Sequence, residues 1–103
     1  MKIFYIQYES IPTSESNDYK GTGGAFINCW IKATSIEAAK NMAENSINEN
    51  NWKILSLEES FLVNEEHYKE NDESREFYQQ AVIDGEVYVY HSWTNEAQEE
   101  QVH

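Results

Sequence analysis

Three glycines stand directly ahead of an apolar run in the segment KGTGGAFINCW, which extends from Lys20 to Trp30. In phosphate-binding loops, glycines let backbone amides converge on the anion, and the helix that follows points its positive end at it. In this segment strand-forming residues follow the glycines, and the lysine that such a loop requires after its last glycine is missing. The segment is therefore predicted to be a loop that ends where a strand begins, with no phosphate-binding role.

Cys29 is the single cysteine, which excludes an internal disulfide. A nucleophilic thiol needs a neighbouring base, and His91 on another strand is the candidate for that role. The apolar residues that share a strand face with Cys29, Ile27 and Ile31, instead favour a buried thiol that behaves as a small hydrophobic side chain. We therefore expect no catalytic pair of Cys29 and His91.

The histidines lack the spacing that puts two metal ligands on one face: they are His67, His91 and His103. The acidic run from Glu65 to Glu76 lacks the spacing and the glycine of a calcium-binding loop, and it is predicted to be a solvated helix face. A domain of this size also leaves little room for a pocket that shifts carboxylate pKa values. No catalytic residue, metal or cofactor is predicted, and an enzyme is the less favoured class.

The composition is that of one folded domain. The chain has 103 residues, of which 40% are hydrophobic and 14% aromatic. We expect a single domain over residues 1–95 and a frayed acidic tail over residues 96–103. The first residues, MKIFYIQYES, resemble a strand rather than a signal peptide, and no apolar run approaches the roughly 20 residues that cross a bilayer. A cytoplasmic location is therefore expected.

The charge of the chain narrows the choice of partners. Acidic side chains outnumber basic ones by 19 to 7, which gives a formal net charge of -12. A field of this sign repels phosphate backbones and anionic lipids, so it disfavours nucleic-acid and membrane partners. It is compatible with a basic protein partner, and also with a role in solubility alone.

Four segments have the composition of strands: residues 2–9, 25–33, 52–63 and 86–93. The third of these strands is predicted to be bent or bulged, because its apolar residues change face along its length. Residues 10–24 include the only proline and most of the glycines, so they are predicted to form a long loop.

Two helices are expected between these strands. The sequence TSIE predicts a capping box in which a helix begins at Thr34 and Glu37 is the reciprocal partner, and the run NENN is predicted to end this helix. A second helix is predicted from about Asp72 to Ile83, with Gly85 closing it in a left-handed conformation. The order is therefore strand, strand, helix, strand, helix, strand. We expect an α+β fold with a single mixed four-stranded sheet and both helices packed on one face.

The other face of this predicted sheet carries aromatic side chains where polar ones would be usual. Seven residues make up this candidate partner-binding surface: Tyr5, Phe26, Asn28, Trp30, Trp52, Tyr88 and Tyr90. Exposed patches with tyrosine and tryptophan are typical of interaction sites. Three alternatives stay open: strand propensity alone favours aromatic residues, a single bulge would shift the face assignment by one residue, and the long loop or the tail would hide the face if it covered it.

These features favour a small acidic non-enzymatic interaction protein that binds a protein partner, or a second copy as a homodimer, through the aromatic face. One form of this hypothesis is an inhibitor or immunity-type protein that imitates phosphate charge to block a nuclease or another nucleic-acid-binding protein. The alternative is a small-molecule-binding or weakly catalytic domain that uses the cleft under residues 10–24, because long loops in compact domains are often functional.

Overall fold

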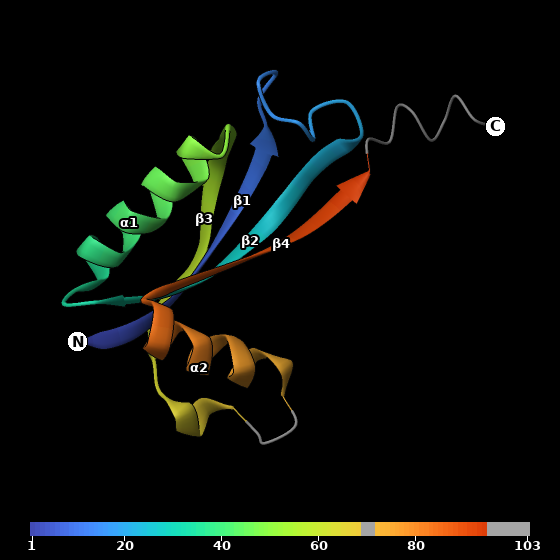
Figure 1. Cartoon of the computed structure of the whole chain (residues 1–103). Helices are drawn as coiled ribbons and strands as arrows, with labels where there is room; N and C mark the ends of the chain where they lie inside the picture. Colours follow the sequence, from blue (N-terminus) through green and yellow to red (C-terminus); the bar gives the residue numbers. More distant parts are fainter. Residues whose placement is uncertain (69–71, 95–103) are drawn as a thin grey trace.

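The computed structural model describes residues 1–68 and 72–94, and Figure 1 shows their arrangement. Four strands form one open sheet in the order β3-β1-β2-β4: β1 (Lys2–Pro12), β2 (Thr22–Ala33), β3 (Trp52–Val63) and β4 (Glu86–Thr94). The helices are α1 (Ile36–Glu49), the short 3-10 helix η1 (Glu65–His67) and α2 (Glu73–Asp84). None of these helices is long and apolar enough to cross a membrane. The predicted α+β class and element order are confirmed, whereas the predicted tail at residues 96–103 lies outside the described residues.

Every neighbouring pair of strands is antiparallel, so the prediction of a mixed sheet was wrong. The connection through α1 makes β2 and β3 parallel to each other, but β1 lies between them and runs opposite to both. The connection through α2 then crosses to the far edge of the sheet, where β4 pairs with β2. The unit through α1 therefore joins parallel strands that are not neighbours, and the unit through α2 joins strands of opposite direction, so no pair in the sheet is parallel.

The two helices pack on opposite faces of the sheet, not on one face as predicted (Figure 1). α1 covers the core cluster that contains Ile6, Ile27 and Cys29, and α2 covers the cluster that contains Ile3 and Trp30. Both alternating sets of side chains in β1 and β2 include large apolar residues, among them Ile3, Tyr5 and Trp30 on the α2 face, so each face needs a cover that removes these residues from water. A helix layer on one side alone would have left one apolar face in solvent.

α1 is anchored by three residues that are fully buried against the sheet: Ala39, Ala43 and Ile47. Its cap is Ser35, whose Oγ accepts a hydrogen bond from the amide of Ala38 at 3.1 Å. The predicted cap at Thr34 is wrong by one residue, because Ser35 is the residue that keeps the extended conformation that a cap requires. The helix ends within the run NENN, as predicted.

α2 begins and ends as the sequence predicts. The Asp72 side chain accepts an amide hydrogen bond of 2.9 Å in the first turn, and Gly85 closes the helix with a φ of 91°. Ala81 is fully buried on the sheet side, and its small side chain lets the helix backbone approach the sheet closely. The Lys32 Nζ of β2 donates a hydrogen bond of 3.1 Å to the Val82 carbonyl, which satisfies one of the last carbonyls of α2.

β3 is bulged, as predicted, and shows two register shifts against β1. Each shift inserts an unpaired residue and reverses the alternation of the side chains that follow. Leu57 therefore lies opposite Tyr8 on the α1 face, whereas Phe61 lies opposite Tyr5 on the α2 face.

The glycines at the start of β2 accommodate an aromatic ring. β1 extends to Pro12 and β2 begins at Thr22, so the loop between them covers residues 13–21 and is shorter than predicted. Gly24 lies within β2, where a Cβ would be only 2.5 Å from Cζ2 of the Trp93 side chain. The missing Cβ leaves space for the indole ring against the β2 backbone. Close packing against Trp93 thus explains this glycine without a phosphate.

Candidate functional site

The seven residues of the predicted aromatic surface are divided between the two faces of the sheet. Four lie on the α2 face and three on the α1 face: Tyr5, Phe26, Asn28 and Trp30 on the former, and Trp52, Tyr88 and Tyr90 on the latter. The register of β4 decides this division, because Tyr88 lies opposite Cys29 and Tyr90 lies opposite Ile27. The prediction of one shared face was wrong, since β4 alternates valine with tyrosine and either set is compatible with burial.

Trp30 is a core residue, with only 2% of its surface exposed beneath α2. Its ring centroid lies 5.2 Å from that of Tyr5 and 5.1 Å from that of Phe77. Its Nε1 donates a hydrogen bond of 3.0 Å to the Tyr68 hydroxyl. Burial, followed by the charge of Glu59, raises the pKa of Tyr5 to about 12, so this hydroxyl stays protonated at neutral pH. Trp30 therefore offers almost no surface to a partner while α2 is docked.

Beyond α2 no described element covers the same face of the sheet, and we call this region the open face. In Figure 1 α2 lies against one end of the sheet, while β1, β2 and β4 continue past it. The open face includes seven side chains from these strands: Gln7, Glu9, Phe26, Asn28, Val89, His91 and Trp93. The Phe26 and Trp93 ring centroids lie 5.4 Å apart, yet 37% of each residue is exposed. The Gln7 amide donates a hydrogen bond of 2.9 Å to Oδ1 of Asn28.

A small hollow lies between the open face and α2. Its volume is about 310 Å³, and its lining includes three of the predicted partner-binding residues: Tyr5, Asn28 and Trp30. Phe61 of β3 also lines the hollow, with its ring centroid 5.2 Å from that of Tyr5 and 45% of the residue exposed. The apolar surface of the open face therefore continues toward η1 and α2.

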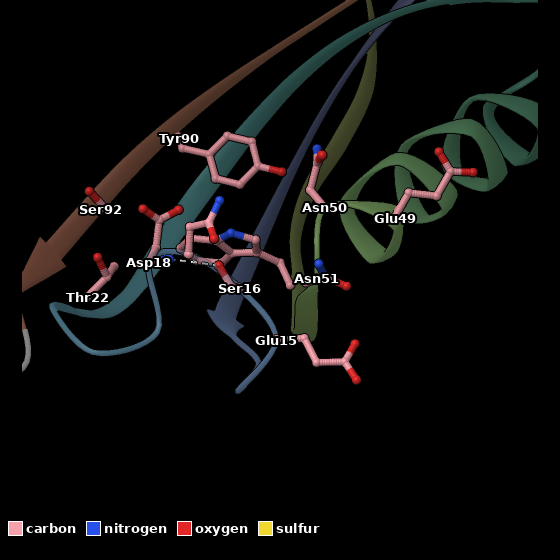
Figure 2. Close-up of a pocket in the computed structure, with 11 residues that line it drawn as sticks. Glu15, Ser16, Asp18, Thr22, Glu49, Asn50, Asn51, Tyr90 and Ser92 are labelled. Carbon is pink, nitrogen blue, oxygen red and sulfur yellow. Dashed lines mark hydrogen bonds between the residues drawn. The ribbon is translucent and has the colours of Figure 1, made fainter.

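A larger cleft lies on the α1 face, under the loop of residues 13–21 (Figure 2). Its volume is about 480 Å³, and its lining comes from the loop, the end of α1 and β4, including Glu15, Asp18, Glu49, Asn50, Tyr90 and Ser92. We call it the acidic cleft, because three of its described lining residues are carboxylates and none of those described is lysine, arginine or histidine. Figure 2 shows Asp18 and Asn50 flanking the Tyr90 ring, with Glu15 and Glu49 farther from it.

The loop is held over the acidic cleft by hydrogen bonds. The amide and the Oγ1 of Thr13 both donate to the Asn51 carbonyl, each at 2.9 Å. Asn51 has a left-handed φ of 65°, which turns the chain from α1 into β3. Within the loop, the Asp18 amide donates to Ser16 Oγ at 3.1 Å, and the Thr22 amide donates to the Asp18 carbonyl at 3.1 Å. These bonds fix the position of Asp18.

Two aromatic residues from opposite edges of the sheet line the cleft together. Trp52 of β3 and Tyr90 of β4 meet edge to face, with ring centroids 5.2 Å apart. They can meet because the strands between them carry a pair of small, fully buried residues on this face, Ser10 and Ala25. In both strands these small residues stand among larger ones. This sequence feature indicates the cleft, but the sequence analysis did not use it.

The electrostatics of the acidic cleft suit a cation. The cleft lies at the C-terminal end of α1, where carbonyls carry the negative end of the helix dipole, and no basic residue occupies the last turn. Burial raises the pKa of Tyr90, and the side chain of Asn50 offsets part of this rise, so the phenol is neutral at physiological pH. The Tyr90 hydroxyl is buried and interacts with the Asn50 side chain. It forms no hydrogen bond of standard geometry to any described residue.

Cys29 and His91 lie on opposite faces of the sheet, so they cannot form a catalytic pair. Cys29 is fully buried under α1, and burial raises the pKa of its thiol to about 12. His91 lies opposite Phe26 on the open face and is exposed. Within residues 1–68 and 72–94, no group of three or more histidine, cysteine or acidic side chains is arranged to hold a metal ion.

No family model, curated protein or solved structure matches this chain. The structure defines an acidic α+β protein with one antiparallel sheet, an open face and an acidic cleft. Its function is argued from the chemistry of these two features.

Proposed function

We propose that this chain is a small non-enzymatic interaction protein that binds a protein partner through the open face. The observation that carries the proposal is the exposed pair of Phe26 and Trp93, which lies where α2 no longer covers the sheet. Large, rigid aromatic side chains contribute most of the binding energy at many protein interfaces. Asn28 and His91 beside this pair supply polar groups of the kind that surround such an apolar centre.

The net charge of -12 favours a basic partner over a second copy of the chain. Opposite charge draws a partner to the surface and accelerates encounter at low ionic strength, whereas two copies repel each other. An inhibitor or immunity-type protein that imitates nucleic-acid charge is one form of this function. Its affinity for the target would fall steeply between low and high salt, and a flat response would contradict charge mimicry.

Capture of partner proteins with matched variants tests the proposal. Phe26→Ser/Trp93→Ser removes the aromatic pair, and Leu55→Ser/Leu57→Ser removes two similarly exposed side chains from β3 as the control. Denaturation curves establish that each variant is folded. We expect the wild type and the control to retain the same protein and the open-face variant to lose it, whereas equal retention by all three would contradict the proposal.

A second candidate function is the binding of a small cationic ligand in the acidic cleft. The specific observation is the cleft itself, whose volume of about 480 Å³ lies in the range of small-molecule sites. A thermal-shift screen with polyamines, amino acids, nucleotides and metal ions tests it. A cationic compound that stabilises the wild type but not Asp18→Asn is the expected result, and no stabilisation by any compound would contradict this function.

A further inference from the structure

β4 is an outer strand of the sheet, and no described residue pairs with its free edge. The other outer strand, β3, has two register shifts and carries Lys53, Glu58 and Glu59, features that discourage pairing with another chain. β4 lacks such protection, because its register with β2 is unbroken from Glu86 to Trp93 and it carries no lysine or proline. A regular edge of this kind is a template for an added strand.

One hydrogen bond fixes which backbone groups of β4 face outwards. The Lys32 amide donates to the Gly85 carbonyl at 2.8 Å, directly ahead of β4. Because hydrogen-bonded pairs alternate along an antiparallel ladder, three residues direct their N–H and C=O groups toward β2: Val87, Val89 and His91. The intervening residues direct theirs away from the sheet: Tyr88, Tyr90 and Ser92.

These outward-facing groups lie beside the acidic cleft, because Tyr90 and Ser92 also line it (Figure 2). An added strand lies about 4.8 Å from its neighbour, and a residue directly opposite Tyr90 places its own side chain on the same face of the sheet. On that face lie Asp18, the other carboxylates of the cleft and the negative end of α1. Lysine and arginine complement this set of charges.

We propose that the partner supplies an extended segment that pairs with the free edge of β4 and inserts a lysine or arginine side chain into the acidic cleft. This inference rests on the proposed function and adds the chemistry of the bound segment. The residues that alternate with the basic ones in that segment lie on the other face of the sheet, beside Val89, His91 and Trp93. Apolar side chains at these positions would extend the open face. The bound pattern is therefore basic and apolar in alternation. A second copy of β4 does not fit, because it carries no lysine or arginine.

The probe is a short peptide of alternating lysine and valine, with its affinity measured by titration calorimetry at low salt. With the peptide antiparallel to β4 and a lysine opposite Tyr90, the lysine backbone amides bond to β4 and the valine amides point away. Methylation of the lysine backbone amides is expected to weaken binding at least about tenfold, whereas methylation of the valine amides preserves most of the affinity. Equal binding of the two methylated peptides would overturn strand addition, and so would a failure of the unmethylated peptide to bind.

The role of the acidic cleft is tested with two double variants that change the net charge equally. Asp18→Asn/Glu49→Gln removes two carboxylates from the cleft, and Glu58→Gln/Glu66→Gln removes two exposed carboxylates outside it. We expect the cleft variant to bind the lysine–valine peptide at least about fivefold more weakly than the control variant. Equal affinities would overturn insertion of the basic side chain into the cleft.

Ser92→Pro removes an outward N–H group from β4 and leaves the ladder to β2 intact, whereas Ser92→Ala keeps that group. Loss of peptide binding by the proline variant alone is expected, and binding by both would overturn pairing at this edge. If the proline variant does not fold, the comparison of the two methylated peptides is the test of pairing at this edge.

If the peptide tests fail while Phe26→Ser/Trp93→Ser still loses its captured protein, edge pairing is overturned and the proposed function stands. Success with the peptide and no loss of capture would instead overturn the role of the open face.

Discussion

Two tryptophans on the same face of the sheet differ in what covers them. Trp30 is enclosed by Tyr5, Phe77 and the Tyr68 hydroxyl beneath α2. Trp93 instead rests on the glycine backbone of β2 and keeps more than a third of its surface exposed. The first residue therefore stabilises the fold, while the second is accessible to a partner.

Trp30→Ala is expected to lower the free energy of unfolding by about 3–5 kcal/mol, because it removes a large buried ring and leaves a cavity under α2. Tyr68→Phe removes only the acceptor of the Trp30 hydrogen bond, so its expected cost is about 1 kcal/mol. Urea denaturation followed by circular dichroism measures both values. A cost below about 1 kcal/mol for Trp30→Ala would show that α2 does not enclose this side chain.

Cys29 is expected to resist alkylation in the native protein. Burial raises the pKa of its thiol to about 12, so almost no thiolate is present at neutral pH, and the sulfur is inaccessible under α1. A thiol reagent at neutral pH should therefore react only after denaturant is added. His91→Ala is the control, since His91 lies on the other face and should not change the rate. Rapid native labelling that slows in His91→Ala would contradict this arrangement.

At the scale of elements, α2 depends on a sharp termination that brings the chain into β4. Gly85 has a φ of 91°, a conformation in which a side chain is strained, and its amide donates to the Ala81 carbonyl at 2.8 Å. The same residue accepts the hydrogen bond from Lys32 that fixes the ladder of β4. Gly85 thus ends α2, and its backbone carbonyl accepts the bond that starts the ladder of the strand that follows.

Gly85→Ala is expected to lower the free energy of unfolding by about 1–2 kcal/mol, because alanine is disfavoured at this φ although nothing obstructs its Cβ. Gly21→Ala is the matched control: no atom lies within 4 Å of its added Cβ and its φ is not left-handed. We expect the control to change stability by less than about 0.5 kcal/mol. Equal effects in thermal or urea unfolding would contradict the role of the left-handed cap.

The elements themselves could be predicted from the sequence, but their layering could not. Local features define the type and order of the elements, the bulge in β3 and the cap at Gly85, because each depends on residues close together in the chain. The alternation of residues along a strand shows which residues face the core only when one of the two alternating sets is polar. In β4 the sets containing Val89 and Tyr90 are both apolar, so the pattern fits either face.

The candidate sites illustrate the same physical limit. The acidic cleft joins Asp18 of a loop, Glu49 of α1 and Tyr90 of β4, and only the tertiary fold brings these positions together. The aromatic composition did indicate Phe26 as an accessible residue, but it also selected Trp30, because nothing in the sequence shows where α2 stops along the sheet. The long loop over a cleft was foreseeable, since loop composition is a local property.

At the scale of the whole molecule, the net charge of -12 opposes the compact state through repulsion between carboxylates. We expect the urea midpoint to rise from low salt to about 0.15 M sodium chloride, where the Debye length shortens to about 8 Å. Potassium chloride should give the same increase, because screening does not depend on the cation. A constant or falling midpoint would show that attractive pairs such as Glu65–Arg75, at 2.6 Å, outweigh the repulsion.

The position of β1 has a consequence for the order in which the sheet forms and opens. β1 precedes the other strands along the chain yet lies inside the sheet, between β2 and β3. The hairpin of β1 and β2 closes over a short loop, whereas β3 and β4 join across whole helices, so folding is expected to begin at the inner hairpin. Amide protons of the inner strands should then exchange slowest with solvent, and those of β4 should alternate between slow and fast. A partner strand on β4 would slow the exchange of three fast amides: Tyr88, Tyr90 and Ser92.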